Sequence, residues 1–501
     1  MESNMKKLLV LATACAAAVV GFSKTITVTS TADEFPITDG ALDPSKLTEG
    51  TLRWALANAE DGDTITFNTS LAGGTITVKG VCEVNPKQDA SMLVNKGVTI
   101  VGPVGGITID SNYKNGGQDD GGRLFNVPAG IASKVTFSGI RFYRGNGRGW
   151  GAAGNKNFPG GACSVGSPVR NALPAFTKTG VDNGGGAILA TADLELDGCS
   201  FLGCGVNAGG IWGGAIMLAG DSSNPLVFAA KDTSFIDCYG YAYGGAMWIH
   251  TGVSSATFEG CSFVRCAIRA NDMRGGAIYA DPDAGTKVRF DDCVFRENSL
   301  YNQGWGGAIF GIRGKWVFNR CEFYRNMGAQ CGGAIALREG SNGEPECIAV
   351  NCTFCQNWCG NHGGAADVRN GSYFVNCTFA GNRVTNPSGS TASPSIYIAS
   401  TCKLLNCCSV YAFNCNGWLS NSKGTPVSTG NYNGFDGSAR TLVNCLTSDY
   451  TPVLDLDNEE QLENMSKLFT GYEYWEYPVP NCNPCATNGT TIAIGYWEPE
   501  N

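Results

Sequence analysis

Closely spaced carboxylates are the residues of this sequence that could most directly do chemistry. Asp291 and Asp292 are adjacent, and a pair of carboxylates can share the acid and base work of glycoside hydrolysis. Asp281 and Asp283 are a second pair of closely spaced acids. Asp281-Pro282-Asp283 is also a turn sequence, and Asp291-Asp292 occupies a turn position of the repeat described below. We therefore predict structural roles for these acids and assign no catalytic residue.

Cysteine and histidine offer the other chemistry. The chain has 23 Cys but only two His, His250 and His362, which nearly excludes a His-rich metal site or a His-based relay. Cys482 and Cys485 have the spacing of a redox motif or of half a zinc site, but no second pair has matching spacing. We predict a local disulfide between Cys482 and Cys485, no metal site and no cofactor.

The overall composition indicates a folded, acidic chain, whose fold must position the acids, cysteines and histidines named above. Of the 501 residues 69 are Gly, and 43% are hydrophobic, which can supply a large core. Only 16% are charged, so a disordered polyelectrolyte is excluded. The formal charge is 35 − 44 = −9, which disfavours a nucleic-acid partner.

The N-terminus has the features of a secretory signal. Lys6-Lys7 precedes an apolar stretch from Leu8 to Phe22, and small residues follow it. We interpret residues 1–23 as a signal peptide and predict that the chain is exported. Cleavage before Cys15, as in a lipoprotein, is an open alternative. The apolar stretch is too short for a typical membrane span, so we expect no transmembrane segment in the mature chain.

Two alternating motifs repeat along the middle of the chain. Gly-Gly-Ala followed by an apolar residue begins at Gly185, Gly213, Gly244, Gly275, Gly306, Gly332 and, in weaker form, Gly363. The intervals are 28, 31, 31, 31, 26 and 31 residues. Between these segments stands Cys-x-Phe or Thr-x-Phe, followed three residues after Phe by Cys or Asn; its Phe residues are Phe201, Phe235, Phe263, Phe295, Phe323, Phe354 and Phe379.

The columns of these repeats predict strands. Cys and Phe flank a mostly polar residue, which is the period of two of a strand with one buried face. We expect the Phe column to be buried, together with the Ile column of Ile188, Ile216, Met247, Ile278, Ile309 and Ile335. An inward stack is expected for Cys199, Cys261, Cys293, Cys321, Cys352 and Cys377, with disulfides between rungs left open. A ladder of bonded amides is expected for Asn298, Asn326, Asn357 and Asn382.

Short strands that return to the same columns predict a coil of parallel strands. No helical pattern separates the strands, which argues against alternating strand–helix units. A propeller blade would need about 40 residues and hairpin turns. We therefore predict an all-β solenoid.

The Gly-Gly-Ala-Ile and Phe-x-x-Asn pairs resemble the repeats of polymorphic outer-membrane proteins, within the pectate-lyase-like group of right-handed parallel β-helices. The opening is also similar, through residues 51–56 on a short predicted helix and the segments 62–67, 98–102, 123–125 and 135–139. The resemblance covers residues 24–445. It implies a right-handed parallel β-helix with a secreted or surface role, often adhesion; the C-terminal barrel of its autotransporter members has no counterpart pattern here.

The same group includes polysaccharide hydrolases and lyases. The hydrolase pattern expects Gly-His-Gly before Arg-x-Lys, but here Arg313-Gly314-Lys315 precedes Asn361-His362-Gly363. A lyase of the group would hold Ca²⁺ near an Arg base, and Asp281, Asp283 and Arg289 are the nearest match. An enzyme acting on acidic polysaccharide therefore stays an alternative.

We divide the chain by these patterns. Residues 1–23 form the signal peptide, 24–145 the N-terminal cap and first rungs, 146–184 a Gly-rich insertion, 185–445 the repeat β-helix and 446–501 a C-terminal cap. Within the cap, Asp457 to Leu468 resembles a capped short helix, and Thr491 to Glu498 looks like a final rung.

One further column suggests a binding surface. The residue after each Ile position reads Leu189, Met217, Trp248, Tyr279, Phe310, Ala336 and Asp367. Because strand side chains alternate, Trp248, Tyr279 and Phe310 should lie outside on consecutive rungs, about 5 Å apart. Exposed rings at that spacing suit stacking on sugars or packing against a protein. We assign them as binding residues; the alternative is that loops cover them or that they only pin neighbouring strands.

Three function classes follow. We favour an exported, non-catalytic, adhesin-like rod, secreted or associated with a bacterial surface or outer membrane, whose partner is a surface glycan or a protein receptor. The carbohydrate-active enzyme is the second class. The third is a structural envelope component that self-associates.

Overall fold

A computed structural model gives the structure of the chain. It describes residues 23–38, 41–78, 91–112, 122–146, 184–206, 212–268, 273–300, 304–338, 346–368, 372–384, 395–398, 402–405, 407–410, 413–414, 435–436, 440–443, 446–447, 472–478 and 491–497. The predicted signal peptide apart from residue 23, residues 147–183 of the insertion, the helix expected from Asp457 to Leu468, and Cys482 and Cys485 lie outside these residues.

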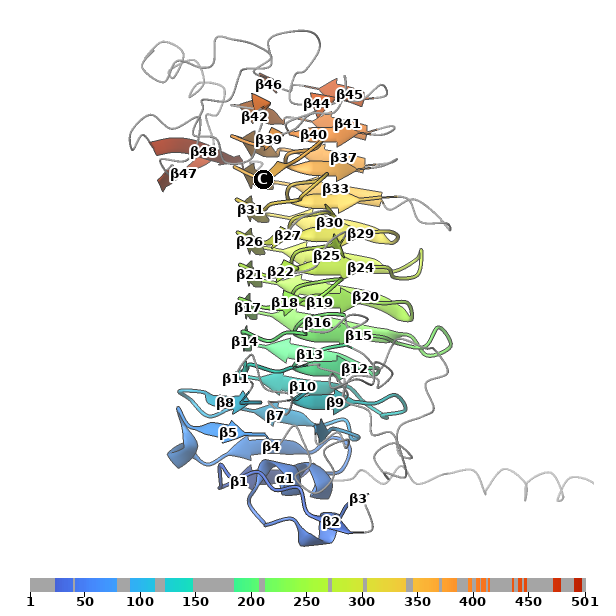
Figure 1. Cartoon of the computed structure of the whole chain (residues 1–501), viewed down its shortest axis with the longest axis vertical. Helices are drawn as coiled ribbons and strands as arrows, with labels where there is room; N and C mark the ends of the chain where they lie inside the picture. The colour runs from blue at the N-terminus through green and yellow to red at the C-terminus, as the bar shows by residue number, and fades with distance from the viewer. Residues whose placement is uncertain are drawn as a thin grey trace, which may run out of the picture.

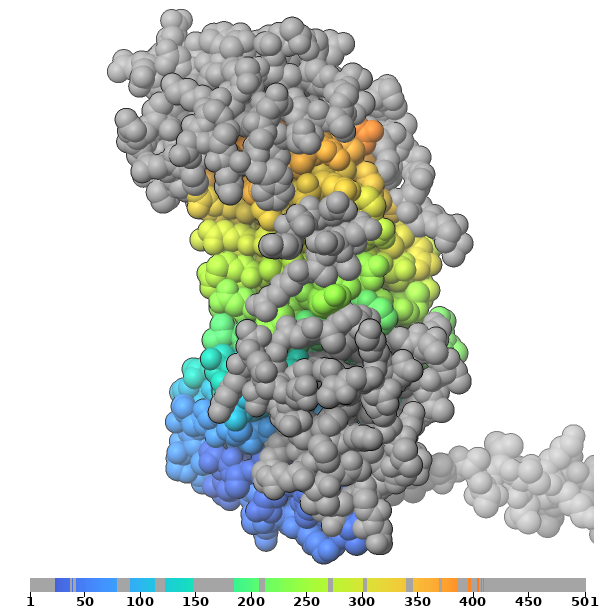
Figure 2. All heavy atoms as spheres, in the orientation of Figure 1, coloured from blue at the N-terminus to red at the C-terminus, as the bar shows by residue number. Residues whose placement is uncertain are grey.

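The chain is an all-β solenoid of parallel strands, as the repeats predict. Its coils stack along one long axis (Figure 1). A typical coil adds one strand to each of three sheets, which have 13, 12 and 11 strands among the described residues. The space-filling view shows the described coils as successive bands in chain order along this axis (Figure 2). With strands about 4.8 Å apart, thirteen of them make a rod roughly 60 Å long.

The three sheets are named here by their residues. The long-strand sheet contains β1 (Thr25–Val28), β4 (Thr64–Phe67), β7 (Thr99–Val101), β10 (Val135–Ser138), β13 (Leu194–Asp197), β16 (Leu226–Lys231), β20 (Val253–Glu259), β25 (Lys287–Asp291), β30 (Lys315–Asn319), β33 (Glu346–Val350), β37 (Ser372–Val375), β41 (Cys402–Leu405) and β45 (Arg440–Val443). The Phe sheet contains β5 (Thr75–Thr77), β8 (Ile107–Asp110), β11 (Ile140–Tyr143), β14 (Ser200–Leu202), β17 (Ser234–Ile236), β21 (Ser262–Val264), β26 (Val294–Arg296), β31 (Glu322–Tyr324), β34 (Thr353–Cys355), β38 (Thr378–Ala380), β42 (Cys408–Val410) and β46 (Leu446–Thr447). The Gly-Ala sheet contains β6 (Met92–Leu93), β9 (Phe125–Val127), β12 (Ile188–Ala190), β15 (Ile216–Leu218), β19 (Met247–Ile249), β24 (Ile278–Ala280), β29 (Ile309–Gly311), β32 (Ile335–Leu337), β36 (Ala366–Val368), β40 (Ile396–Ile398) and β44 (Phe435–Asp436).

Shorter elements complete the described chain. Small parallel ladders join β18 (Tyr239–Gly240), β22 (Ala267–Ile268) and β27 (Ser299–Leu300), then β23 (Met273–Arg274) and β28 (Gly304–Trp305), and then β35 (Trp358–Cys359), β39 (Arg383–Val384) and β43 (Phe413–Asn414). β2 (Ile37–Thr38) pairs with β3 (Ala41–Leu42). Two 3-10 turns, η1 (Pro44–Lys46) and η2 (Thr69–Leu71), lie on either side of α1 (Leu52–Asn58) and β4.

The prediction that Thr491 to Glu498 form a final rung of the solenoid is wrong. β48 (Thr491–Trp497) runs antiparallel to β47 (Tyr472–Pro478) and forms a separate two-stranded sheet with it. Because the Ile-rich alternation of residues 491–497 fits either kind of pairing, the sequence could not distinguish a coil from a hairpin-like pair.

The predicted short helix near residue 51 is confirmed as α1. Thr51 caps its N-terminus, with its hydroxyl accepting from the backbone N–H of Trp54 at 3.3 Å. Arg53 of this helix is buried and forms a two-bond pair with Asp33, both distances 2.8 Å. Within the described part of the chain, no helix has the length and apolarity that crossing a bilayer requires.

The repeat columns are in register, and the predicted core is confirmed. Each residue of the Ile column pairs with the next one along the sheet, for example Met247 with Ile278, and the same holds for Phe263 with Phe295. All predicted Ile-column and Phe-column residues are fully buried. Rings of the Phe column stack nearly parallel, with centroids 4.7 Å apart for Phe235 and Phe263.

The Gly-Gly-Ala sequence meets three separate steric demands. The first Gly turns the corner with positive φ, as in Gly275 at +70°. The second Gly lies against the next coil, where a Cβ at Gly307 would approach the carbonyl oxygen of Gly333 more closely than real Cβ atoms ever do. The Ala side chain points into the core and is fully buried, as in Ala308. Coils can therefore stack at this corner only where the backbone is nearly bare.

Two polar ladders run along the inside of the corners. The six Cys of the inward stack are buried free thiols, and each bonds weakly to backbone carbonyls; Cys261 Sγ, for example, lies 3.4 Å from the oxygens of Ala230 and Glu259. The Asn column forms the expected amide ladder, with Asn326 Nδ2 donating to Asn357 Oδ1 at 3.0 Å. Burial raises the pKa of Cys199 to about 12, so these thiols stay protonated at neutral pH.

Candidate functional site

Two outward columns flank the Gly-Gly-Ala corner and form one outer face. The residue before the first Gly and the residue after the Ile position are five apart in the sequence. Side chains of these two positions pack together outside the core of the coil. The first column reads Gly184, Trp212, Tyr243, Arg274, Trp305, Cys331 and His362. Backbone bridges join most of the successive members, for example Trp305 with Cys331 and Cys331 with His362. The second is the aromatic column named above. The face therefore changes from aromatic residues to a polar group along the rod.

The rings predicted to be exposed are buried. Trp248, Tyr279 and Phe310 do lie outside the solenoid core on consecutive coils, but their exposed fractions are only 7%, 6% and 1%. They form a second hydrophobic cluster with Leu189, Met217, Ala219 and Ala336. The expectation of a solvent-exposed stripe is corrected, because a second layer of side chains packs over these rings.

That second layer is aromatic and partly exposed. Trp212, Tyr243 and Trp305 pack against the buried rings; the ring centroids of Tyr243 and Tyr279 lie 4.5 Å apart. The guanidinium of Arg274 stacks over Trp305 at 4.7 Å and over Phe310 at 5.0 Å. The indole N–H of Trp248 is buried without a hydrogen-bond partner. We call this set, from Trp212 to Trp305 with the rings beneath it, the aromatic face.

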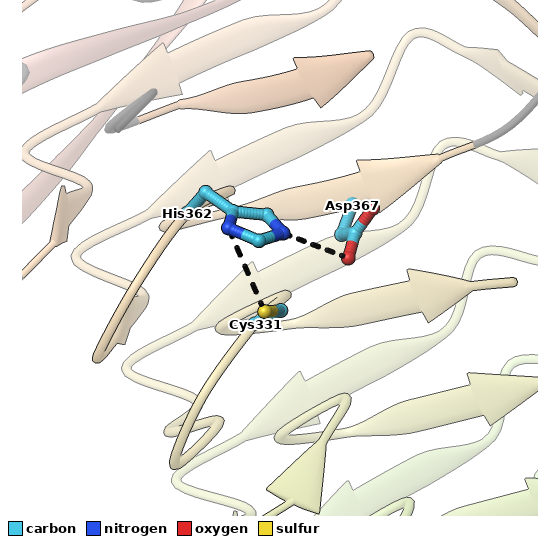
Figure 3. A group of neighbouring side chains, drawn as sticks. All are labelled: Cys331, His362 and Asp367. Atoms are coloured by element: carbon cyan, nitrogen blue, oxygen red, sulfur yellow. Dashed lines mark hydrogen bonds and ion pairs between the residues drawn. The ribbon is translucent and has the colours of Figure 1, made fainter. Parts of the chain in front are cut away.

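A polar cluster continues the aromatic face over the next two coils. The imidazole of His362 lies between Cys331 and Asp367 (Figure 3). Cys331 Sγ is 3.8 Å from His362 Nδ1, and His362 Nε2 is 3.6 Å from Asp367 Oδ2. One ligand atom from each of the three residues lies within 4.8 Å of the others. Exposed fractions are 2% for Cys331, 19% for the His362 side chain and 0% for the Asp367 side chain.

Charged and aromatic neighbours enclose this cluster. Arg338 Nε donates to Asp367 Oδ2 at 3.0 Å, and its Nη2 lies 3.4 Å from His362 Nε2. The Arg338 guanidinium also stacks on Trp305 at 4.7 Å, which joins the cluster to the aromatic face. Tyr397 packs against the imidazole with ring centroids 4.2 Å apart. Asp367 Oδ1 is buried and has no hydrogen-bond partner.

A thiol, an imidazole and a carboxylate in this arrangement can bind a metal ion or activate the thiol. Both uses need deprotonated or proton-accepting donors, which Cys, His and Asp supply. Counting histidines could not reveal this cluster, because one residue of each type from three separate segments is enough. The sequence did contain a sign of this cluster in the positions of its residues. Cys331 and His362 belong to the column before the first Gly, and Asp367 is the last residue of the column that follows the Ile positions.

The carboxylates considered for catalysis hold turns together. Arg289 Nη2 donates to Asp291 Oδ1 at 2.7 Å, and Arg320 Nε donates to Asp292 Oδ1 at 2.7 Å. Burial alone would raise the pKa of Asp291, but hydrogen bonds from Arg289 and Asn319 outweigh it and lower that pKa.

The proposed calcium pair is likewise engaged. Arg313 Nε donates to Asp281 Oδ1 at 2.9 Å, and Asp283 Oδ2 accepts from the backbone N–H of Gly252 at 2.9 Å. The structure does not bring Arg289 to these two acids, because it pairs with Asp291. The other histidine, His250, packs against Trp248 with ring centroids 4.8 Å apart.

No family model matches the chain. No curated protein matches it either. A solved structure titled "Geobacillus virus E2 - ORF18" is similar over 76% of this chain, with 14% identity and a TM-score of 0.34. The match spans 62% of that protein's length. The polymorphic outer-membrane protein resemblance therefore stays a hypothesis.

Proposed function

We propose that this chain is an exported, non-catalytic β-solenoid that binds a surface glycan or a protein receptor through the aromatic face, in the manner of an adhesin. The supporting observation is that the solenoid core is complete without that face. The core cluster inside the coils and the cluster around Trp248 are separate sets of buried residues. A second apolar layer with partly exposed rings outside a closed core is typical of a recognition surface.

The chemistry of the face fits sugars or an aromatic-rich protein patch. Partly exposed Trp212, Tyr243 and Trp305 offer ring faces, and Arg274 offers donors for carboxylate or hydroxyl groups. The resemblance to surface β-helices and the secretory features of residues 1–23 support export. Membership of the polymorphic outer-membrane protein repeat family and a right-handed coil are part of this proposal.

The test is a glycan array and a host-surface binding assay on the full chain and on a Trp212→Ala/Tyr243→Ala variant. Because these partly exposed rings also pack on Trp248 and Tyr279, their loss should lower the melting temperature. Binding is therefore compared well below the melting temperature of the folded variant, where it should be reduced. Tyr373→Ala is the matched control, because Tyr373 is an exposed ring on the long-strand sheet. Equal binding by all three proteins would refute the proposal.

An activity assay separates the enzymatic alternative. The full chain is incubated with uronate-containing polysaccharides, and released products are measured. Product release that is lost in Asp291→Asn or Asp283→Asn variants would replace the adhesin proposal with a lyase or hydrolase.

A further inference from the structure

We propose that Cys331, His362 and Asp367 form a binding site for a divalent transition-metal ion of the zinc class. The inference is independent of the adhesin proposal. It starts from the donor set, since thiolate, imidazole and carboxylate are the side chains that bind Zn²⁺ in proteins.

The separations of the donors fit a small ion. Three atoms within 4.8 Å of one another share a point no more than about 2.8 Å from each. Zinc binds sulfur at about 2.3 Å and nitrogen or oxygen at about 2.0–2.2 Å, so each donor needs to move inward by roughly 0.5–0.8 Å. Cys331 Sγ lies 3.8 Å from His362 Nδ1, whereas Asp367 Oδ2 lies 3.6 Å from His362 Nε2. An ion would bind only one of these two nitrogens, so the imidazole must turn as the donors close around it.

The surroundings supply the outer support that a metal site needs. Arg338 fixes one oxygen of Asp367 by a 3.0 Å hydrogen bond, as outer residues commonly do for ligating carboxylates. The other oxygen, Oδ1, is buried without a hydrogen-bond partner, which is costly for a carboxylate oxygen. The packing of Tyr397 on the imidazole limits its rotation.

Charge sets a condition on binding. Asp367 and a deprotonated Cys331 contribute two negative charges, equal to the charge of a divalent ion, while Arg338 adds one positive charge beside Asp367. Binding therefore releases the Cys331 proton, and affinity should rise with pH. The titratable or charged groups facing Cys331 are His362, Asp367, Arg338 and the neighbouring thiol Cys359.

The alternative use of the same residues is an activated thiol. An imidazole with a thiol on one nitrogen and a carboxylate on the other is the usual arrangement of a nucleophile with its base and orienting group. Cys331, however, is only 2% exposed, which leaves little room for a substrate to approach its sulfur. A metal ion is much smaller than a substrate and needs less room. The burial of Cys331 therefore favours a metal site over an activated thiol.

The experiment is a titration of the reduced, metal-free full chain with Co²⁺ and Zn²⁺. The background carries Cys482→Ser and Cys485→Ser, so that this pair cannot bind metal. We expect one ion per chain, a thiolate-to-cobalt charge-transfer band, and displacement of Co²⁺ by Zn²⁺. Cys331→Ser and His362→Ala should each weaken binding about 100-fold or more, and Asp367→Asn at least 10-fold. The control Cys355→Ser removes another buried thiol and should leave binding unchanged.

Two results would overturn the proposal. One is the absence of a charge-transfer band in the background chain, which is decisive even if a variant fails to fold. The other is equal cobalt binding by the background chain and the folded Cys331→Ser variant. If no ion binds and iodoacetamide alkylates Cys331 much faster than Cys355, the cluster is an activated thiol instead.

Discussion

The side-chain amide of Asn298 donates from Nδ2 to Oδ1 of Asn326, 2.9 Å away in the next coil. The same oxygen accepts the backbone N–H of Asn298 at 3.0 Å, and the amide of Asn326 continues the pattern to Asn357. Towards the N-terminus the column changes to Cys266 and Cys238, whose thiols bond to carbonyls instead. The corner is therefore stabilised by two different side chains at one position of the repeat.

This change of residue predicts a difference between two equivalent substitutions. Asn298→Cys extends the thiol part of the column by one coil, whereas Asn326→Cys interrupts the amide ladder and leaves the buried amide of Asn298 short of an acceptor. We expect Asn326→Cys to lower the free energy of unfolding by about 1–3 kcal/mol more than Asn298→Cys. Denaturant unfolding followed by circular dichroism measures the difference; equal costs would contradict the ladder's role.

The bare corner predicts a severe effect of one methyl group. Gly307→Ala places a Cβ against the carbonyl oxygen of Gly333, so the two coils must move apart. We expect the free energy of unfolding to fall by about 3 kcal/mol, or the chain to fail to fold. Gly285→Ala is the control, because a Cβ there meets nothing within 4 Å. Melting temperatures of the two variants test this, and a stable Gly307→Ala protein would be incompatible with the close stacking.

Neighbouring residues of β14 predict opposite outcomes. Phe201 is fully buried in the ring stack, whereas Leu202, the next residue, is 42% exposed. Phe201→Ala should lower the free energy of unfolding by about 3–5 kcal/mol. Leu202→Ala should change it by no more than about 0.5 kcal/mol. Calorimetry of both variants checks the inside and outside assignment of the Phe sheet. Similar costs would mean that the strand is turned the other way.

The thiol stack predicts loss of stability in alkali. Burial raises the pKa of Cys321 and Cys352 well above normal, while the unfolded thiols ionise near pH 8.5. The folded chain then retains more protons than the unfolded chain, so stability is complete below about pH 8.5 and falls as pH rises further. Replacing both residues by Ala should reduce the slope of stability against pH above that value. An unchanged slope would show that other groups cause the alkaline loss.

Asp291 predicts a smaller effect in acid. Its pKa is lowered in the folded state by Arg289 and Asn319, so its contribution is present above its unfolded value near 3.9 and disappears as pH falls through the folded value. Because the Arg289–Asp291 ion pair is partly exposed, Asp291→Asn should lower the free energy of unfolding by no more than about 1 kcal/mol at pH 7. The difference from the unmodified chain should vanish at low pH. A difference that persists at pH 2 would point to packing rather than charge.

The sequence alone determined the solenoid, its register and its core. Alternation within a strand fixes which side chains face inward, and a repeat of constant columns places identical residues above one another. Phe295, Ile309 and Asn326 could therefore be assigned from spacing, as could the Gly-Gly corner. These are local rules, in which each residue's position depends on its own coil and on the equivalent position of the next.

Only the tertiary structure decided what happens outside the coils. Whether Trp248 is exposed depends on Trp212 and Tyr243, which belong to another column and reach over it. Cys331 and Asp367 are 36 residues apart and meet His362 only because coils stack and the corner turns both columns outward. Side chains beyond the core are not constrained by alternation, so their contacts follow from packing between coils and from the charges that collect there.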